Sequence, residues 1–156
     1  MLPRSLYMKY YLMTAAIIIV DQISKMMIRG WMSVGESIPV LGDFFRITYV
    51  RNTGAAFSML SGQRVLLIAI PVVVVAVALW YFHHHKDKHW TFYTGWAMII
   101  AGGIGNLIDR IIFGWVTDML DFSIFPPVFN IADIGVTVGC GLFVFYTIME
   151  ERLQKS

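Results

Sequence analysis

The sequence predicts an all-α integral membrane protein with four transmembrane helices and a small extramembrane β-sheet between the first two. Composition is the first observation behind this prediction: 58% of the 156 residues are hydrophobic, only 14% are charged, and the mean hydropathy is +0.68. A soluble domain usually carries about 25% charged residues. The second observation is that the chain contains four apolar segments of membrane-spanning length.

A membrane-spanning helix needs about 20 residues to cross a hydrocarbon core of about 30 Å. The four apolar segments cover approximately residues 10–28, 65–82, 90–108 and 129–149. The first is interrupted by charged residues and is not followed by a small-residue cleavage site, so we expect it to stay in the membrane rather than to be removed as a signal peptide. The whole chain, residues 1–156, is expected to form a single membrane domain.

The segment from about residue 33 to 60, between the first two spans, is expected to form the extramembrane β-structure. Apolar and polar residues alternate over 45–49, which is the period-two pattern of a half-buried strand. Residues 37–41 are a candidate partner strand. Residues 52–54 have the composition of a turn, and the apolar residues 55–57 follow it.

Four crossings place both termini on one side of the membrane, together with the short turn at 83–89. The loops at 30–63 and 110–128 then lie on the other side. The termini and the short turn carry six Lys and Arg residues against five on the opposite side. Because positive residues favour the cytoplasmic face, and the first span usually dominates insertion, we expect both termini to be cytoplasmic.

Polar residues within or beside the spans all map to the side of the membrane that carries the long loop. They are Asp21 and Lys25 near the end of the first span, Asn106, Asp109 and Arg110 at the end of the third, and Asn130 and Asp133 at the start of the fourth. Ionisable groups at membrane depth cost about 2.5 to 3.5 kcal/mol each, so they persist where they pair or perform chemistry. Asp21 and Lys25 are spaced i, i+4 and can neutralise each other as a structural pair. Asp109 lies beside Arg110, which suggests an orienting carboxylate that stays ionised.

Three carboxyl groups, those of Asp118, Asp121 and Asp133, have no partner within their own segments. Two carboxylates about 4 Å apart repel by about 4 kcal/mol at an effective dielectric near 20, which corresponds to about 3 pKa units. If two of the three meet, they share one proton at neutral pH. Such a pair can take a proton from water and donate another to a carbonyl oxygen, which is the chemistry of an aspartic protease.

Other kinds of site are less well supported by the sequence. A serine mechanism lacks a histidine on the face that carries the carboxyl groups. The tract His83–His85 is expected to be a solvated turn, so we expect no metal site there. The net charge of +2 comes from scattered residues, which argues against nucleic acid as a partner. A proton-coupled transporter and a non-catalytic membrane scaffold are the alternatives that remain.

Five short segments of the chain carry a resemblance to a known family. They are Asp21-Gln22-Ile23-Ser24-Lys25, Arg51-Asn52-Thr53-Gly54-Ala55-Ala56-Phe57, Gly105-Asn106-Leu107-Ile108-Asp109-Arg110, Val116-Thr117-Asp118 and Phe129-Asn130-Ile131-Ala132-Asp133. In this order they resemble the bacterial lipoprotein signal peptidases, also called type II signal peptidases. The resemblance covers almost the whole chain. It implies an intramembrane aspartic endopeptidase that removes the signal peptide of a diacylglyceryl-modified prolipoprotein by cutting on the N-terminal side of the lipidated cysteine.

The resemblance also implies a role for each matching residue. Asp118 and Asp133 would form the catalytic pair. The residues that would bind substrate, orient the pair or shape the extramembrane rim are Asn52, Gly54, Asn106, Asp109, Arg110 and Asn130. Asp21 and Lys25 would brace the helices. Asp121 is expected to be a satisfied loop carboxylate, and Thr117 stands where the family usually has valine.

The resemblance sets the remaining expectations for location and partners. The protein is expected in the bacterial cytoplasmic (inner) membrane as a multi-pass protein, with its active site toward the outer face. Its partners are then the lipidated prolipoprotein substrate and membrane lipid, without nucleic acid, metal or organic cofactor. We expect it to act as a monomer.

Overall fold

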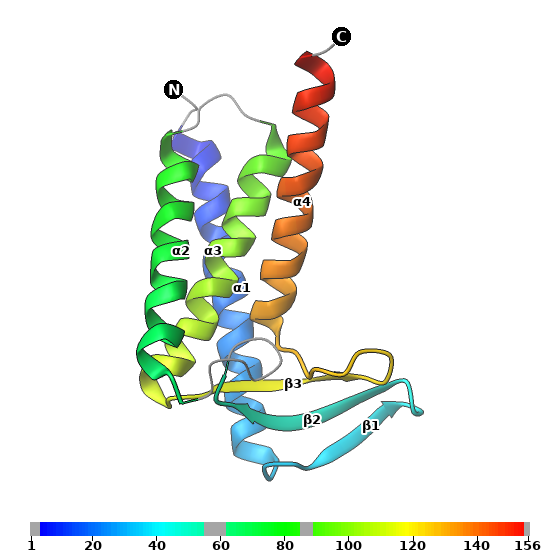
Figure 1. Cartoon of the computed structure of the whole chain (residues 1–156). Helices are drawn as coiled ribbons and strands as arrows, with labels where there is room; N and C mark the ends of the chain where they lie inside the picture. The colour runs from blue at the N-terminus through cyan, green and yellow to red at the C-terminus, as the bar shows by residue number, and fades with distance from the viewer. Residues whose placement is uncertain (1–3, 55–61, 85–88, 155–156) are drawn as a thin grey trace.

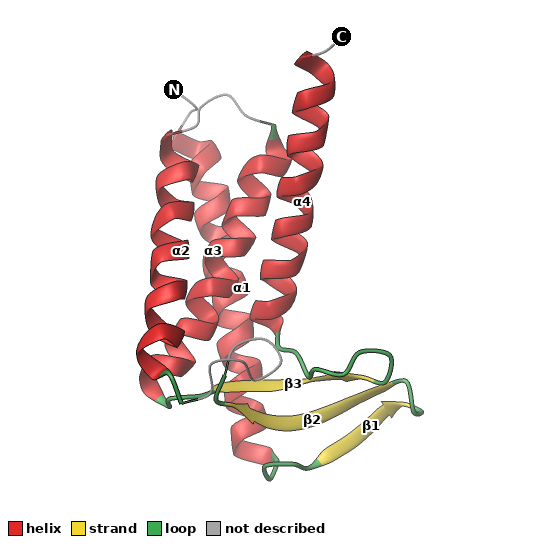
Figure 2. Cartoon of the chain, viewed as in Figure 1, coloured by secondary structure: helices red, strands yellow, loops and turns green. Residues whose placement is uncertain are grey.

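A computed structural model describes residues 4–54, 62–84 and 89–154 of the chain. The elements follow the order α1 (Arg4–Trp31), β1 (Ser37–Leu41), β2 (Phe45–Asn52), α2 (Arg64–His84), α3 (Trp90–Ile112), β3 (Val116–Phe122) and α4 (Ile131–Gln154). The helices run side by side, and the sheet lies across the end of the bundle opposite the two termini (Figures 1 and 2). The apolar stretch expected at 55–57 lies outside the described residues.

The four expected membrane helices are confirmed. Four helices are long and apolar enough to cross a bilayer, and their spans are Tyr7–Trp31, Arg64–His84, Trp90–Ile112 and Ile131–Arg152. Each extends beyond the expected apolar window at one or both ends. The first helix, α1, begins at Arg4 rather than at Tyr10 and continues to Trp31 rather than to Ile28. The fourth begins at Ile131, two residues later than expected.

The extramembrane sheet has one more strand than expected. β1 pairs with β2 as expected, and the pairing is antiparallel, with Ile38 opposite Ile47. The third strand, β3, comes from the segment between α3 and α4, which we expected to be a loop, and it pairs with the other edge of β2. Since β3 leads from α3 toward α4, the sheet joins the two halves of the chain and places Asp118 beside the helix ends.

The bundle is organised around α3, which contacts each of the other three helices. Glycines allow α3 and α4 to approach closely. A Cβ atom added to Gly95 would lie 2.9 Å from the backbone oxygen of Gly139, and one added to Gly139 would lie 2.7 Å from that of Gly95. Small residues at such positions let membrane helices pack backbone against backbone. This close packing fixes α4, and with it Asp133, relative to α3.

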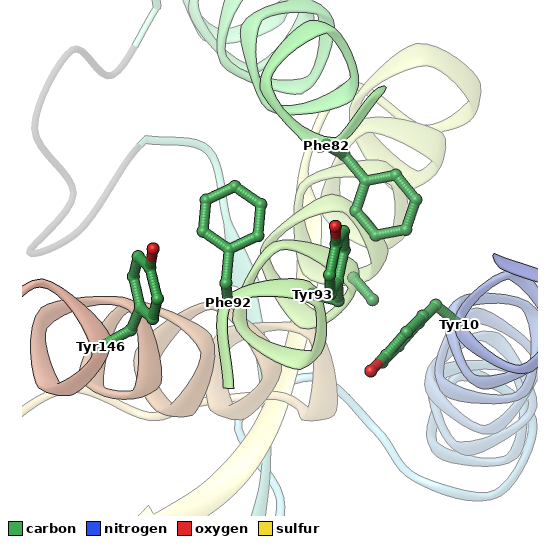
Figure 3. Packing of buried hydrophobic residues seen from close by; sticks show 6 residues of the cluster. Tyr10, Phe82, Phe92, Tyr93 and Tyr146 are labelled. Atoms are coloured by element: carbon green, nitrogen blue, oxygen red, sulfur yellow. The ribbon is translucent and has the colours of Figure 1, made fainter. Parts of the chain in front are cut away.

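An aromatic cluster holds the helices together at the end away from the sheet. Its buried members include Tyr10 of α1, Phe82 of α2, Phe92 and Tyr93 of α3, and Tyr146 of α4 (Figure 3). Several of the ring pairs meet edge to face, for example Phe92 and Tyr146 with centroids 5.3 Å apart. Edge-to-face pairs are a favourable aromatic geometry. The apolar core and the polar cluster therefore occupy opposite ends of the bundle.

Candidate active site

The polar residues singled out in the sequence gather where the sheet meets the ends of the helices. Asp118 lies on β3, and Asn52 ends β2. Asn106 lies in the second-last turn of α3, and Asp133 lies in the first turn of α4. Asn130 directly precedes α4 and is fully buried. Four segments that are distant in the sequence therefore contribute to one site.

Asp133 owes its position to the way in which α4 begins. The backbone N–H of Asp133 donates to Asn130 Oδ1 at 2.9 Å, and the backbone N–H of Asn130 donates to Asp133 Oδ2 at 3.1 Å. This reciprocal arrangement is a capping box, in which the cap residue and the residue three positions later satisfy each other's free N–H groups. The spacing i, i+3 seen in the sequence thus fixes the Asp133 carboxylate at the helix N-terminus.

Asp118 is held by amide groups from two other segments. Asn130 Nδ2 donates to Asp118 Oδ1 at 2.6 Å, and Asn52 Nδ2 donates to Asp118 Oδ2 at 3.1 Å. The Asp118 residue is only 2% exposed. Burial raises the pKa of the Asp118 carboxyl to about 7, with a further increase from the nearby charge of Asp133. The two carboxyl groups are therefore electrostatic neighbours, and Asp118 changes protonation near neutral pH.

Asn106 links the two carboxyl groups. Its Nδ2 donates to Asp133 Oδ1 at 2.7 Å, and its Oδ1 accepts from Asn130 Nδ2 at 3.1 Å. Asn130 Nδ2 also serves Asp118, as described above. A continuous chain of hydrogen bonds thus runs from Asp118 through two amides to Asp133.

Asp21 and Lys25 of α1 form a buried ion pair next to Asn106. The expected i, i+4 pair is present, with Lys25 Nζ 2.9 Å from Asp21 Oδ2, and both side chains are almost wholly buried. Lys25 Nζ also donates to Asn106 Oδ1 at 2.9 Å. Asp21 Oδ1 accepts the backbone N–H of Ala132 at 2.9 Å, so the pair braces α1 against the start of α4.

The expectation that Arg110 is the cation partner of Asp109 was wrong. Asp109 does not pair with Arg110; its nearest cations are Arg29, at 3.5 Å, and Lys25, at 3.8 Å. Adjacent helical residues point about 100° apart, so Arg110 faces a different direction. Arg110 Nη2 donates to the backbone oxygen of Gly54 at 3.1 Å, which ties α3 to the rim after β2.

Arg29 and Thr117 belong to the site's surroundings but were not selected from the sequence. Asp109 Oδ2 accepts the backbone N–H of Thr117 at 2.9 Å, and Arg29 Nη1 donates to Thr117 Oγ1 at 3.0 Å. These contacts fix the position of Thr117, the residue that precedes Asp118 on β3. A signal was present in the spacing, because Arg29 lies i+4 from Lys25 and i+8 from Asp21 on the same helical stripe.

Asp121 lies three residues after Asp118 on the same strand but away from the cluster. Its Oδ2 accepts a hydrogen bond from the Thr48 hydroxyl at 2.7 Å. Within the described ranges, no group of three or more His, Cys, Asp and Glu side chains is placed to hold a metal ion.

The expectation of a solvated turn was wrong for His83 and His84, which are the last two residues of α2. His83 Nε2 lies 3.0 Å from the Tyr11 hydroxyl.

The fold and the site together define a multi-pass membrane protein that holds two neighbouring carboxyl groups at one end of its helical bundle. Such a pair suits aspartic-type hydrolysis. A sequence model described as "Signal peptidase (SPase) II" matches residues 13–149, and the chain belongs to this family.

Similar proteins agree with this membership. The protein named "Lipoprotein signal peptidase" from Halothermothrix orenii is 44% identical over 144 residues, which is 92% of this chain and 97% of the relative. A protein of the same name from Desulfitobacterium hafniense is 39% identical over 137 residues, which is 88% of this chain and 91% of the relative.

Two solved structures described as bacterial membrane enzymes also share the fold. The first, determined by the in meso method at 2.3 Å resolution, has a TM-score of 0.88 and 30% identity, and the match covers 95% of this chain and 92% of that one. The second, at 1.9 Å, has a TM-score of 0.81 and 32% identity, and covers 88% and 90%.

Proposed function

We propose that this chain removes signal peptides from diacylglyceryl-modified prolipoproteins, and that Asp118 and Asp133 are its catalytic pair. Removal of signal peptides from prolipoproteins is the activity of the family to which the chain belongs. The cut is expected on the N-terminal side of the lipidated cysteine. The observation that carries the residue assignment is the hydrogen-bonded chain through Asn106 and Asn130 that joins the two carboxyl groups.

The charge balance of the site supports a pair that shares one proton. The described cluster contains the carboxyl groups of Asp21, Asp109, Asp118 and Asp133 and the cations Lys25, Arg29 and Arg110. With three cations and four carboxyl groups, the cluster is neutral when one carboxyl is protonated. Because a net charge is costly at membrane depth, this singly protonated form is favoured. The Asp118 pKa of about 7 agrees with a proton held within the pair.

In the proposed reaction, the ionised carboxylate takes a proton from a water molecule whose oxygen attacks the scissile carbonyl carbon. The protonated carboxyl gives its proton to the carbonyl oxygen at the same time. The first carboxyl then passes its proton to the leaving amine as the C–N bond breaks. The second carboxyl recovers its proton from the collapsing diol, so the pair returns to its starting state.

The neighbouring polar residues have supporting roles in this proposal. Asn130 and Asn52 hold Asp118 in place, and Asn106 holds Asp133. Arg110, which is anchored on the Gly54 carbonyl, is near both carboxyl groups and can bind the substrate backbone. All of these groups come from one chain, so we expect the protein to act as a monomer.

The position of the site at the bundle end fits a lipid-anchored substrate. The acyl chains of such a substrate lie in the bilayer, so its scissile bond can reach the helix ends from the side. Water must also reach the pair, which is easier at the helix ends than in the hydrocarbon centre. We propose that the chain lies in the bacterial cytoplasmic membrane with this end toward the outer face and both termini in the cytoplasm.

Substitution of each carboxyl group tests the assignment. Asp118→Asn and Asp133→Asn are each expected to reduce kcat by at least about 10³-fold, because each removes one of the two proton-transfer groups. Asp121→Asn is the matched control on the same strand and is expected to change kcat by less than about twofold, since Asp121 bonds to Thr48 away from the cluster and asparagine can still accept that hydrogen bond. Full activity of either Asp118→Asn or Asp133→Asn in detergent would overturn the pair.

The substrate is tested with a diacylglyceryl-modified precursor and an unmodified precursor, each incubated with the purified protein. Cleavage of the modified precursor alone is expected. Equal cleavage of both precursors would show that the diacylglyceryl group is not required for cleavage. Absence of any cleavage, together with proton-coupled uptake in vesicles, would favour the transporter alternative.

A further inference from the structure

The orientation of the Asn106 amide is determined by Lys25. An ammonium group carries three donors and no acceptor, so the side chain that faces it must present an acceptor. The Asn106 oxygen therefore faces Lys25 Nζ, at 2.9 Å. The Asn106 nitrogen is left to face Asp133 Oδ1, at 2.7 Å. A flipped amide would present its oxygen to Asp133 and its nitrogen to a cation.

The hydrogen bonds and the helix position of Asp133 favour its ionised form, whereas its burial and the Asp21 carboxylate oppose it. Its Oδ1 accepts from the Asn106 amide, and its Oδ2 accepts from the backbone N–H of Asn130. A carboxylate in the first turn of a helix is also stabilised by the helix dipole. Hydrogen bonds donated to a carboxylate support its charged state.

We propose that Lys25 is a positioning residue that, through Asn106, keeps Asp133 as the ionised base and leaves the shared proton on Asp118. This inference rests on the proposed catalytic pair and adds the direction of its proton transfers. Asp133 then takes the proton from water, and Asp118 protonates the carbonyl oxygen. The Asp118 pKa of about 7, raised mainly by burial, agrees with a carboxyl that holds a proton at neutral pH.

Other charged groups face the same site and bear on its pH dependence. α1 contributes Asp21 as well as Lys25, α3 contributes Asp109 and Arg110, and β3 contributes Asp118. Lys25 is the cation of this group that is fully buried, so its charge is screened little by water. Loss of its charge should therefore make ionisation of Asp133 more difficult, whereas Arg110 remains anchored on the rim.

An effect of Lys25 on proton transfer can be distinguished from a purely structural role of Lys25 as the counter-ion of Asp21. Lys25→Met alone would leave Asp21 buried without its cation, which can unfold the protein. The double variant Asp21→Asn/Lys25→Met removes both charges, and the new amide oxygen can still accept the N–H of Ala132. If Lys25 acts only by neutralising Asp21, this neutral pair should restore both thermal stability and activity.

We expect the double variant to fold but to work slowly. Its kcat should fall about 10²-fold with KM changed by less than about threefold, because a buried positioning group affects the chemical step rather than binding. The acidic limb of its kcat–pH profile should move to higher pH, because Lys25 no longer directs the Asn106 amide toward Asp133. Loss of the Asp21 charge acts in the opposite direction, so this shift should be smaller than the shift in Lys25→Gln, which keeps the Asp21 carboxylate. Lys25→Gln keeps a donor toward Asp21 but loses the charge, and it serves if the double variant is unstable.

The controls distinguish failure of this inference from failure of the proposed function. Lys9→Gln removes an exposed lysine from the same helix and should leave kcat and the pH profile unchanged. If Asp118→Asn and Asp133→Asn are inactive but the folded Lys25 variants keep the wild-type kcat and profile, only the role of Lys25 is overturned. If the Asp118→Asn or Asp133→Asn variant is active, the catalytic pair itself is wrong.

Discussion

Asp118 occupies a position in which opposing influences on its carboxyl nearly balance at neutral pH. Burial and the charge of Asp133 favour the protonated form, whereas the amides of Asn130 and Asn52 favour the ionised form. The outcome is a pKa of about 7, well above the ordinary value for aspartate. A carboxyl with this pKa can donate and recover a proton within each catalytic cycle.

The first prediction concerns the pH dependence of the reaction. If Asp118 must carry a proton, kcat/KM should fall as the pH rises through about 7, because the free enzyme then loses that proton. Asn52→Ala removes one donor to the ionised form, so the alkaline limb should move to higher pH by about one unit. The measurement is kcat/KM for a lipidated precursor across the pH range in which the protein remains folded.

The control for this prediction lies on the same strand. Thr48→Val removes a donor to Asp121 rather than to Asp118, so the alkaline limb should stay at its wild-type position. A limb that moves to lower pH in Asn52→Ala would contradict the arrangement of charges around Asp118. Equal shifts in both variants would point to a change in the sheet rather than in the hydrogen bond.

The contacts of single residues were predictable from the sequence only where both partners lie on one helix. The Asp21–Lys25 pair follows from i, i+4 spacing. For Asn130 and Asp133 the i, i+3 spacing indicated a shared face, and the cap that they form was not predicted. The partner of Asp109 could not be found in this way, because Arg29 belongs to another helix. Sequence proximity to Arg110 was misleading, since neighbouring residues leave a helix in different directions.

Among the elements, β3 was the one that sequence periodicity could not reveal. A strand is recognised by alternation when one face is buried and the other is solvated. The first four residues of β3, Val116 to Met119, are all buried, and β3 contacts both α1 and α3. The alternation in β2 was visible since its outer residues, such as Arg46, are exposed.

The packing of α3 against α4 leads to a second prediction. A Cβ atom on Gly102 would overlap the backbone oxygen of Ala132 and lie 2.6 Å from Val136 Cγ2. Gly102→Ala should therefore push the start of α4 away, reduce the free energy of unfolding by about 1–3 kcal/mol and lower kcat by displacing Asp133. Thermal unfolding in detergent and a cleavage assay measure the two effects.

Gly141→Ala is the matched control, because a Cβ atom there would meet nothing within 4 Å. Alanine is favoured over glycine in a helix by about 1 kcal/mol, so this variant should be as stable as the wild type or more stable. Equal losses of stability in Gly102→Ala and Gly141→Ala would contradict the explanation by interhelical contact, because only Gly102 faces a neighbouring helix closely.

At the scale of the whole molecule, the buried residues at the two ends of the helical bundle differ in kind. Aromatic rings such as Tyr93 and Phe82 fill the end near the termini, and charged and amide groups fill the end beside the sheet. The membrane spans and the convergence of polar groups at one end were predictable, because span order and loop length determine which ends lie together. The distances within the polar cluster depend on glycine-mediated helix packing and on β3, which no local pattern encodes.

The last prediction concerns the orientation of the whole molecule in the membrane. The excess of positive residues on the side of the termini is small, six against five, so the direction of insertion needs a direct measurement. Cys140 is exposed on α4 and is first replaced by serine, which leaves a protein without cysteine. Ser123→Cys, beyond β3, and His84→Cys, at the end of α2, then each place one exposed thiol at opposite ends of the bundle. We expect a membrane-impermeant maleimide to label Ser123→Cys in intact cells and His84→Cys only after permeabilisation. The reverse pattern would place Asp118 and Asp133 on the cytoplasmic side, where a precursor already exported across the membrane could not present its cleavage site to them.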